Sequence, residues 1–157
     1  AAVGKTSLIR RYCEGKFEQS RVMTIGVDFQ TQTVRLGDQP VRLSIWDVAG
    51  QERFGSFRSG FYMGARAVAL VYDVTEAESF AHLVRWRDEI RQIVPAVPLT
   101  VIANKVDLAA AVEERAARRW AASQGMPFLT TSAATGLHVG QLFAGLAHLA
   151  VSFRGNL

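Results

Sequence analysis

Three short, nearly continuous apolar runs dominate this 157-residue chain from residue 67 onward. They cover residues 67–74, 99–104 and 126–131. Runs of this length and composition are typical of strands that are covered on both faces. The apolar side chains of residues 78–94 recur at helical spacing, as do those of the C-terminal segment, and residues 110–123 are rich in alanine and arginine. The alternation predicts an α/β fold with a doubly wound, mostly parallel sheet, whose ligands sit at the carboxyl ends of the strands.

The first half of the chain predicts a helix and an antiparallel pair of strands. Residues 6–14 are interpreted as a helix, and residues 27–36 and 41–46 as extended runs joined by a hairpin-like turn at 37–40. With 157 residues and 49% hydrophobic content, the chain suits one buried domain, residues 1–157, and is too short for two ordinary ones. We therefore expect a single domain with one antiparallel edge strand.

The formal charge of +4 does not by itself point to nucleic acid. The arginines are scattered through helical segments such as residues 115–119, where a solvated face explains them, and contact with anionic lipid is the minor alternative. We expect no nucleic-acid binding. Cys13 is the single cysteine, so no internal disulfide forms, which agrees with a reducing, cytoplasmic location.

The sequence Val3-Gly4-Lys5-Thr6 matches the end of the phosphate-binding pattern G-x-x-x-x-G-K-[ST], with Ala1 at the third position. Backbone N–H groups of such a loop and of the helix that follows it form an anion cradle. Lys5 would bridge the β- and γ-phosphates, and the Thr6 hydroxyl would bind Mg²⁺. The alternative is an ordinary helix start. We expect the first glycine and the first strand to precede Ala1, so that the domain is incomplete at its N-terminus.

Polar residues follow other predicted strands and add to this site. Asp47 can hold Mg²⁺ through water, the Gly50 N–H can contact a γ-phosphate, and Gln51 can orient an attacking water. Asp107, in the segment Asn104-Lys105-Val106-Asp107, can accept two parallel hydrogen bonds from guanine, which adenine cannot offer. The backbone of Ser132-Ala133-Ala134 can donate to the guanine carbonyl oxygen. These loops predict one guanine-nucleotide site.

These motifs resemble those of the Ras superfamily of small GTPases, and most closely its Rab branch. The resemblance is carried by AVGKTS, TIGVDF, WDVAGQERF, FYMGA, NKVD and TSAA, in this order along the chain. It implies a P-loop G domain that binds GTP and GDP with Mg²⁺, hydrolyses GTP slowly and acts as a switch in vesicle trafficking. It also implies an exchange factor, a GTPase-activating protein and effectors as partners. Membrane association would need a lipid-anchored tail, which is not visible here.

The resemblance assigns a role to each matching residue. Nucleotide binding falls to Ala2, Val3, Gly4, Lys5, Thr6, Ser7, Phe17, Thr24, Gly50, Asn104, Lys105, Asp107, Ser132, Ala133 and Ala134. Metal binding falls to Thr6, Thr24 and Asp47, and catalysis to Gln51 and Lys5. Phe29, Trp46 and Tyr62 match the aromatic triad of the Rab effector surface, although core packing explains them equally well.

Some positions depart from the family pattern. Val48 replaces a threonine with little expected effect, and Ala134 replaces a lysine or leucine that covers one edge of the guanine. Ala1 and Ala2 add methyl groups near the γ-phosphate, where they can crowd Gln51. Arg21 lies three residues before Thr24, the offset of the built-in arginine in heterotrimeric Gα subunits, although a solvated loop arginine is the simpler reading.

Two functions from different classes therefore stay open. The first is an enzyme that hydrolyses GTP, and the second is a guanine-nucleotide-binding interaction module without hydrolysis. Histidines 82, 138 and 148 lack metal-ligand spacing and are interpreted as helix-surface or partly buried side chains. Cys13 is interpreted as a small packing residue. The joint presence of Lys5, Thr6, Thr24, Asp47 and Gln51 favours the enzyme.

Overall fold

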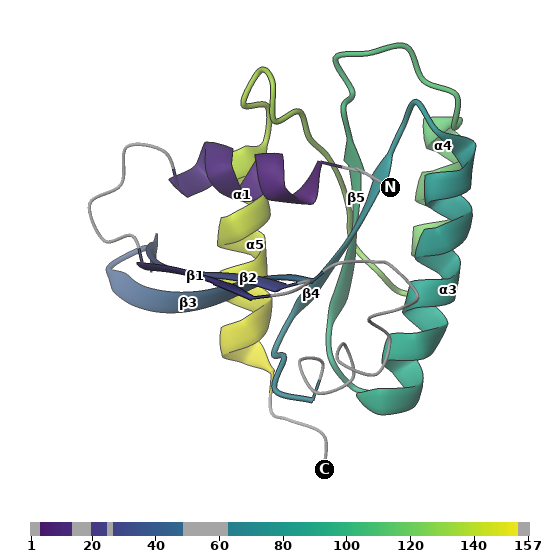
Figure 1. Cartoon of the computed structure of the whole chain (residues 1–157). Coiled ribbons are helices and arrows are strands. Elements are labelled where there is room, and N and C mark those ends of the chain that lie inside the picture. The colour runs from purple at the N-terminus through teal and green to yellow at the C-terminus, as the bar shows by residue number, and fades with distance from the viewer. Residues whose placement is uncertain (1–3, 14–19, 25–26, 49–62, 154–157) are drawn as a thin grey trace.

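The computed structural model describes residues 4–13, 20–24, 27–48 and 63–153, and for residues 20–29 and 46–48 it describes at most the backbone. Its elements alternate as the sequence predicts (Figure 1). In chain order they are α1 (Lys5–Cys13), β1 (Ser20–Thr24), β2 (Val27–Leu36), β3 (Gln39–Val48), β4 (Val68–Asp73), α3 (Ala77–Ile93), β5 (Leu99–Asn104), α4 (Glu114–Ser123), β6 (Phe128–Thr130) and α5 (Val139–Ser152). The predicted α/β class is confirmed.

Strands β4, β5 and β6 form a parallel sheet that is covered on both faces. Helices α3 and α4 lie on one face, and α1 and α5 lie on the other (Figure 1). Each face carries its own hydrophobic core. On β5, Val101 packs in the core on the side of α3 and α4, and its neighbour Ile102 packs in the core on the side of α1 and α5. Both residues are fully buried. Successive side chains of a strand point to opposite faces, so one apolar run supplies both cores. The doubly wound arrangement follows from this burial.

Strands β1, β2 and β3 form a second, antiparallel sheet, whereas we expected one antiparallel edge strand on a single sheet. The added strand, β1, pairs along the free edge of β2, with Ser20 opposite Thr31 and Thr24 opposite Val27. The hairpin turn between β2 and β3 is shorter than predicted. Only Gly37 and Asp38 form it, because the positive φ of Gly37 (61°) allows a two-residue turn. Because Leu36 pairs with Gln39 across this turn, β3 begins at Gln39 and not at residue 41 as predicted.

Other boundaries shift for reasons that lie in long-range contacts. Helix α4 begins at Glu114 instead of residue 110, since the Val74 carbonyl accepts hydrogen bonds from the N–H groups of Ala111 (2.7 Å) and Val112 (3.1 Å). These bonds hold the preceding segment against the end of β4. Strand β6 is also shorter than the apolar run that predicts it, because the N–H of Met126 bonds to Ala121 at the end of α4.

Candidate functional site

A cleft of about 740 Å³ lies between the start of α1 and the loops that follow β5 and β6. Several of its lining residues were predicted to bind nucleotide: Gly4, Ser7, Asn104, Lys105, Asp107, Ala133 and Ala134. They come from three segments that are far apart in the sequence. The parallel strands bring the loops together, because their carboxyl ends meet at one edge of the sheet.

Gly4 lies directly against the side chain of Asn104. A Cβ atom at Gly4 would overlap the amide nitrogen of Asn104, and the φ of Gly4 is +92°, which disfavours any other residue. Asn104 is 1% exposed, and its Oδ1 accepts a hydrogen bond of 3.0 Å from the Thr131 hydroxyl. The end of the phosphate-binding pattern and the predicted guanine-binding segment are therefore in contact.

The loop after β6 is joined to the loop after β5. The Ser132 hydroxyl donates a hydrogen bond of 2.8 Å to Oδ1 of Asp107, and it accepts one of 3.1 Å from the Thr135 N–H. The Val106 N–H bonds to the Thr131 carbonyl at 3.3 Å. Ser132 is fully buried, whereas Asp107 is exposed beside the cleft. This arrangement presents a fixed carboxylate and the adjoining backbone to a ligand.

Lys105 is anchored by a residue that the sequence analysis did not single out, Asp73. The Lys105 Nζ lies 2.8 Å from Oδ2 of Asp73, which is 1% exposed. Burial raises the pKa of Asp73, but hydrogen bonds from Lys105 and from the Thr75 hydroxyl and N–H outweigh burial and hold that pKa below its usual range. Lys105 itself has a φ of 66°, which is unusual for a residue with a side chain. A carboxylate at the end of an apolar run, two residues before Thr75, was the available signal.

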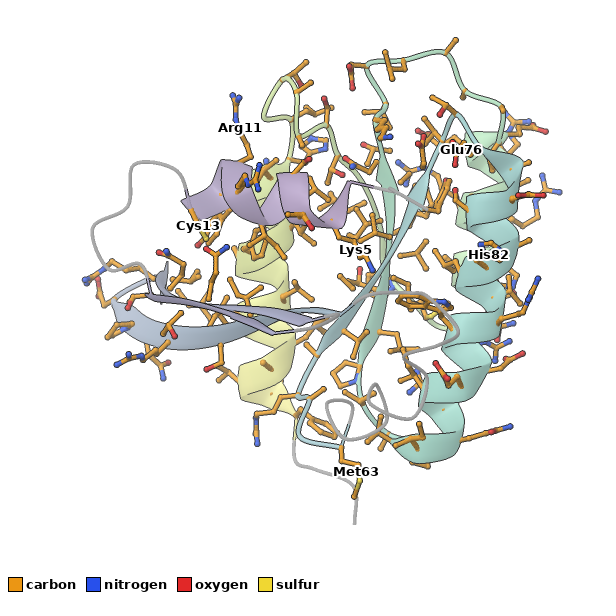
Figure 2. The ribbon with its side chains drawn as sticks, in the orientation of Figure 1. Lys5, Arg11, Cys13, Met63, Glu76 and His82 are labelled. Carbon is orange, nitrogen blue, oxygen red and sulfur yellow. The ribbon has the colours of Figure 1, made fainter. Side chains whose placement is uncertain are left out.

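The side chain of Lys5, which is predicted to bind phosphate, contacts helix α3. Its Nζ lies 4.6 Å from the centre of the Trp86 ring on α3, a cation–π contact, and Lys5 is not among the residues that line the cleft. Figure 2 shows Lys5 reaching from the start of α1 toward α3. Thr6, in the same first turn, is exposed.

The remaining predicted residues are described only in part. Ala2, Val3, Phe17, Gly50, Gln51 and Tyr62 lie outside the described residues. Of Arg21, Thr24, Phe29, Trp46 and Asp47 only the backbone is described. The register places Phe29 opposite Trp46, and it places Thr24 and Asp47 within one residue row of each other across β2.

The three histidines lie at the surface or are partly buried, and the single cysteine is a buried packing residue, as the sequence predicts. His82 and His148 are exposed, His138 is partly buried, and Cys13 is buried and free. Within the described part of the chain, no group of three His, Cys, Asp or Glu side chains is arranged to hold a metal ion. In that same part, none of the helices combines the length and apolarity that a membrane span requires.

A protein-family model of the Ras family matches residues 1–152. The chain belongs to the Ras family. Members of this family are small GTPases, so the Ras-family assignment accounts for a cleft in which a glycine of the phosphate pattern meets Asn104 and Asp107. Guanine-nucleotide binding and GTP hydrolysis follow for the family in general.

Proposed function

We propose that this Ras-family protein is a Rab-like GTPase that binds GTP and GDP with Mg²⁺ and works as a switch in vesicle trafficking. The contact between Gly4 and Asn104, in the cleft that Asp107 adjoins, is the observation that carries the proposal. It places a phosphate-binding element and a base-binding element side by side at one cleft. A cleft of about 740 Å³ is in the range of small-ligand sites.

The base is read by Asp107 and by the loop after β6. The Asp107 carboxylate accepts hydrogen bonds from the ring N–H and the exocyclic amine of guanine, and adenine offers no such pair. The hydrogen bond from Ser132 fixes the orientation of this carboxylate before the ligand arrives. Backbone N–H groups at Ala133 and Ala134 complete the pattern by donating to the base carbonyl oxygen.

The phosphate end combines Lys5, Thr6, Thr24 and Asp47. Hydroxyl and carboxylate oxygens are the donors that Mg²⁺ prefers, and the register of the antiparallel sheet, with Thr24 and Asp47 near the same end, fits this set. Bound Mg²⁺ would supply charge neutralisation for the phosphates. Gln51 positions the attacking water. The Lys5 side chain moves from the Trp86 ring to the phosphates, where its ammonium group stabilises the negative charge that develops on the phosphate oxygens.

The Rab-like assignment rests on the aromatic residues of the two central antiparallel strands. Phe29 and Trp46 are cross-strand neighbours, which supports a shared surface with Tyr62 for an effector. We place the protein in the cytoplasm, with an exchange factor, a GTPase-activating protein and effectors as its partners. Membrane attachment would require a lipid-anchored tail.

A second candidate, nucleotide binding without hydrolysis, is favoured by one observation. Lys5 contacts Trp86 and does not line the cleft. The two candidates are separated by loading the purified protein with GTP and Mg²⁺ and measuring phosphate release in a single turnover. We expect release above buffer, which Gln51→Leu abolishes without preventing GTP binding. Bound GTP with no release would support the second candidate.

Arg21 is proposed as a built-in arginine that neutralises charge on the transferring phosphoryl group. Such an arginine is worth about 10³ to 10⁵ in rate. In the same assay without any partner protein, Arg21→Ala should lower the hydrolysis rate at least about tenfold. An unchanged rate would remove Arg21 from the mechanism and leave the rest of the proposal intact.

A further inference from the structure

Arg11, near the end of α1, reaches across to the loop after β6. Its Nη1 donates to the carbonyl of Ala134 at 3.5 Å, and its Nη2 donates to the carbonyl of Thr135 at 3.4 Å. Figure 2 shows the Arg11 side chain on the side of α1 where this loop lies. Both bonds are long and the group is exposed, but one rigid guanidinium holds two successive carbonyls. The spacing of the loop from α1 is therefore set at two points.

The loop is shaped to receive this side chain. Gly136 has a φ of +85°, and a Cβ atom there would lie 2.9 Å from Nη2 of Arg11. The Gly136 N–H bonds to the Ser132 carbonyl at 2.8 Å, which closes the loop on itself. The positive φ favours glycine at this position, and the absent Cβ atom leaves room for the guanidinium.

The loop after β6 lines the cleft together with Arg11. Ala133 and Ala134 line the cleft, and within the described residues their N–H groups make no hydrogen bond to the protein. Arg11 takes the carbonyl of Ala134, while the Ala134 N–H stays available. The alanine side chains are too short to fix the loop by packing on a ligand. The position of these two donors therefore depends on the contacts that hold the loop, which include the two hydrogen bonds from Arg11.

We propose that Arg11 is a positioning residue for the purine base: it holds the loop after β6 so that the N–H groups of Ala133 and Ala134 meet the carbonyl oxygen of the base. This inference rests on the guanine-nucleotide binding proposed above and adds a specificity determinant on α1. It also means that one helix serves both ends of the nucleotide. Its first turn lies at the phosphate pattern, and Arg11, two turns later, supports the base loop.

The test compares GDP with 2-aminopurine riboside 5′-diphosphate, which lacks the base carbonyl oxygen and also the ring N–H proposed to bind Asp107. Binding of both ligands is measured by isothermal titration calorimetry for the parent chain and its variants. The ratio of variant to parent affinity is taken for each ligand separately, so that the missing ring N–H cancels. Arg11→Ala should weaken GDP about five- to tenfold, since it removes two hydrogen bonds that support the loop. It should leave the affinity for the 2-aminopurine nucleotide within about twofold, because that ligand does not use the loop N–H groups.

Arg119→Ala is the matched control, since Arg119 is an exposed arginine on α4 that carries the same charge and does not line the cleft. It should leave both affinities unchanged. Arg11→Lys keeps the charge but cannot bond to both carbonyls at once, so we expect an intermediate loss of GDP affinity. If Arg11→Ala does not fold, Arg11→Lys replaces it in the test. Equal loss for both ligands, or no loss for GDP, overturns the inference while the proposed function stands. Absence of GDP binding by the parent chain overturns both.

Discussion

At the scale of single residues, the structure constrains Gly4 in the site and Tyr72 in the core in different ways. Gly4 is restricted twice, by its positive φ and by the Asn104 amide that occupies the space of a Cβ atom. Tyr72 is restricted in another way. It is fully buried in the core between the parallel sheet and helices α3 and α4, with Phe80 edge-on at 5.1 Å. Within the described residues, its hydroxyl has no hydrogen-bond partner.

Gly4→Ala should destabilise the protein and impair nucleotide binding. The left-handed backbone disfavours alanine, and the added methyl group must displace Asn104, so we expect a loss of about 2 kcal/mol in the free energy of unfolding. Urea denaturation and GDP titration measure the two effects. Gly145→Ala is the control, because nothing lies within 4 Å of that position in α5, and it should stabilise by about 0.5–1 kcal/mol. Equal behaviour of the two variants would contradict this account of Gly4.

Tyr72→Phe should stabilise the protein, because it removes a buried hydroxyl without a partner. We expect a gain of about 1 kcal/mol at neutral pH, measured by urea denaturation. Burial raises the pKa of Tyr72 to about 12. A tyrosine whose pKa is raised on folding contributes stability that is full below its ordinary pKa of 10.0 and is lost as the pH rises toward 12. The variant should therefore lose less stability than the parent in that alkaline window. A lower free energy of unfolding at pH 7 would show that the hydroxyl has a partner.

At the scale of elements, the turns after β4 and β5 form one unit. Asp73 and Asn104 are paired residues at the ends of these strands, and the Val74 N–H bonds to the Asn104 carbonyl at 3.1 Å. The Ser79 hydroxyl, in the first turn of α3, accepts a hydrogen bond from the Asp73 N–H (2.9 Å), and its single proton lies between the carbonyls of Glu76 (2.7 Å) and Asp73 (3.0 Å). The ion pair between Asp73 and Lys105 joins both turns beneath the cleft. The element that carries the predicted base-binding residues is thus fixed by the one before it.

Asp73→Asn should loosen this unit. At pH 7 we expect a loss of about 2 kcal/mol in the free energy of unfolding, since hydrogen bonds to a charged group are removed. The pKa of Asp73 is lowered on folding, so its contribution is full above the ordinary aspartate pKa of 3.8 and is lost as the pH falls below it. Urea denaturation from pH 7 to pH 3 should therefore show a smaller acid loss in the variant.

Asp88→Asn is the matched control for this prediction. Asp88 is 58% exposed and pairs with Arg87 on the surface of α3, where an ion pair contributes little. The control should follow the parent chain at every pH. Parallel acid profiles for Asp73→Asn and the parent would mean that the ion pair with Lys105 does not contribute to stability.

At the scale of the whole molecule, the cleft is built from segments near both ends of the chain. Gly4 lines the cleft from near the start of the chain, and Ala134 lines it from more than a hundred residues later in the sequence. Between them, the parallel sheet carries a core on each face, and Tyr12 of α1 stacks on Phe143 of α5 at 4.2 Å. A ligand that contacts all these segments can bind only when the chain is folded as a whole.

GDP should therefore stabilise the entire chain against thermal unfolding. At about 100 times its dissociation constant, a ligand that binds only the folded state adds about 2.7 kcal/mol. Differential scanning fluorimetry with GDP, and with ADP as the control ligand, measures the effect. ADP should give no shift, and Asp107→Ala should remove the response to GDP. An equal shift with both nucleotides would contradict reading of the guanine base by Asp107.

Much of this fold follows from local patterns in the chain. The apolar runs predict β4, β5 and β6, because a strand buried on both faces must be apolar on both, and helical periodicity predicts α3 and α5. The motif residues of the cleft are also identified from sequence, since a backbone with positive φ before a helix favours glycine, as at Gly4. The start of α4 was misplaced, because backbone bonds from Ala111 and Val112 to Val74 compete with the helix.

The sequence by itself determined the fold class, the family and the motif residues of the cleft, because each is recorded in residue patterns along the chain. It did not identify the other residues that line the cleft, which are Arg10, Arg11, Cys13, Gln30 and Leu108. Only the tertiary structure decided which residues support them. Asp73 beneath Lys105, Arg11 behind Ala134 and Trp86 under Lys5 are pairs that lie far apart in sequence. No periodicity records such contacts, because packing of separate elements creates them, and the chain must fold completely before they exist.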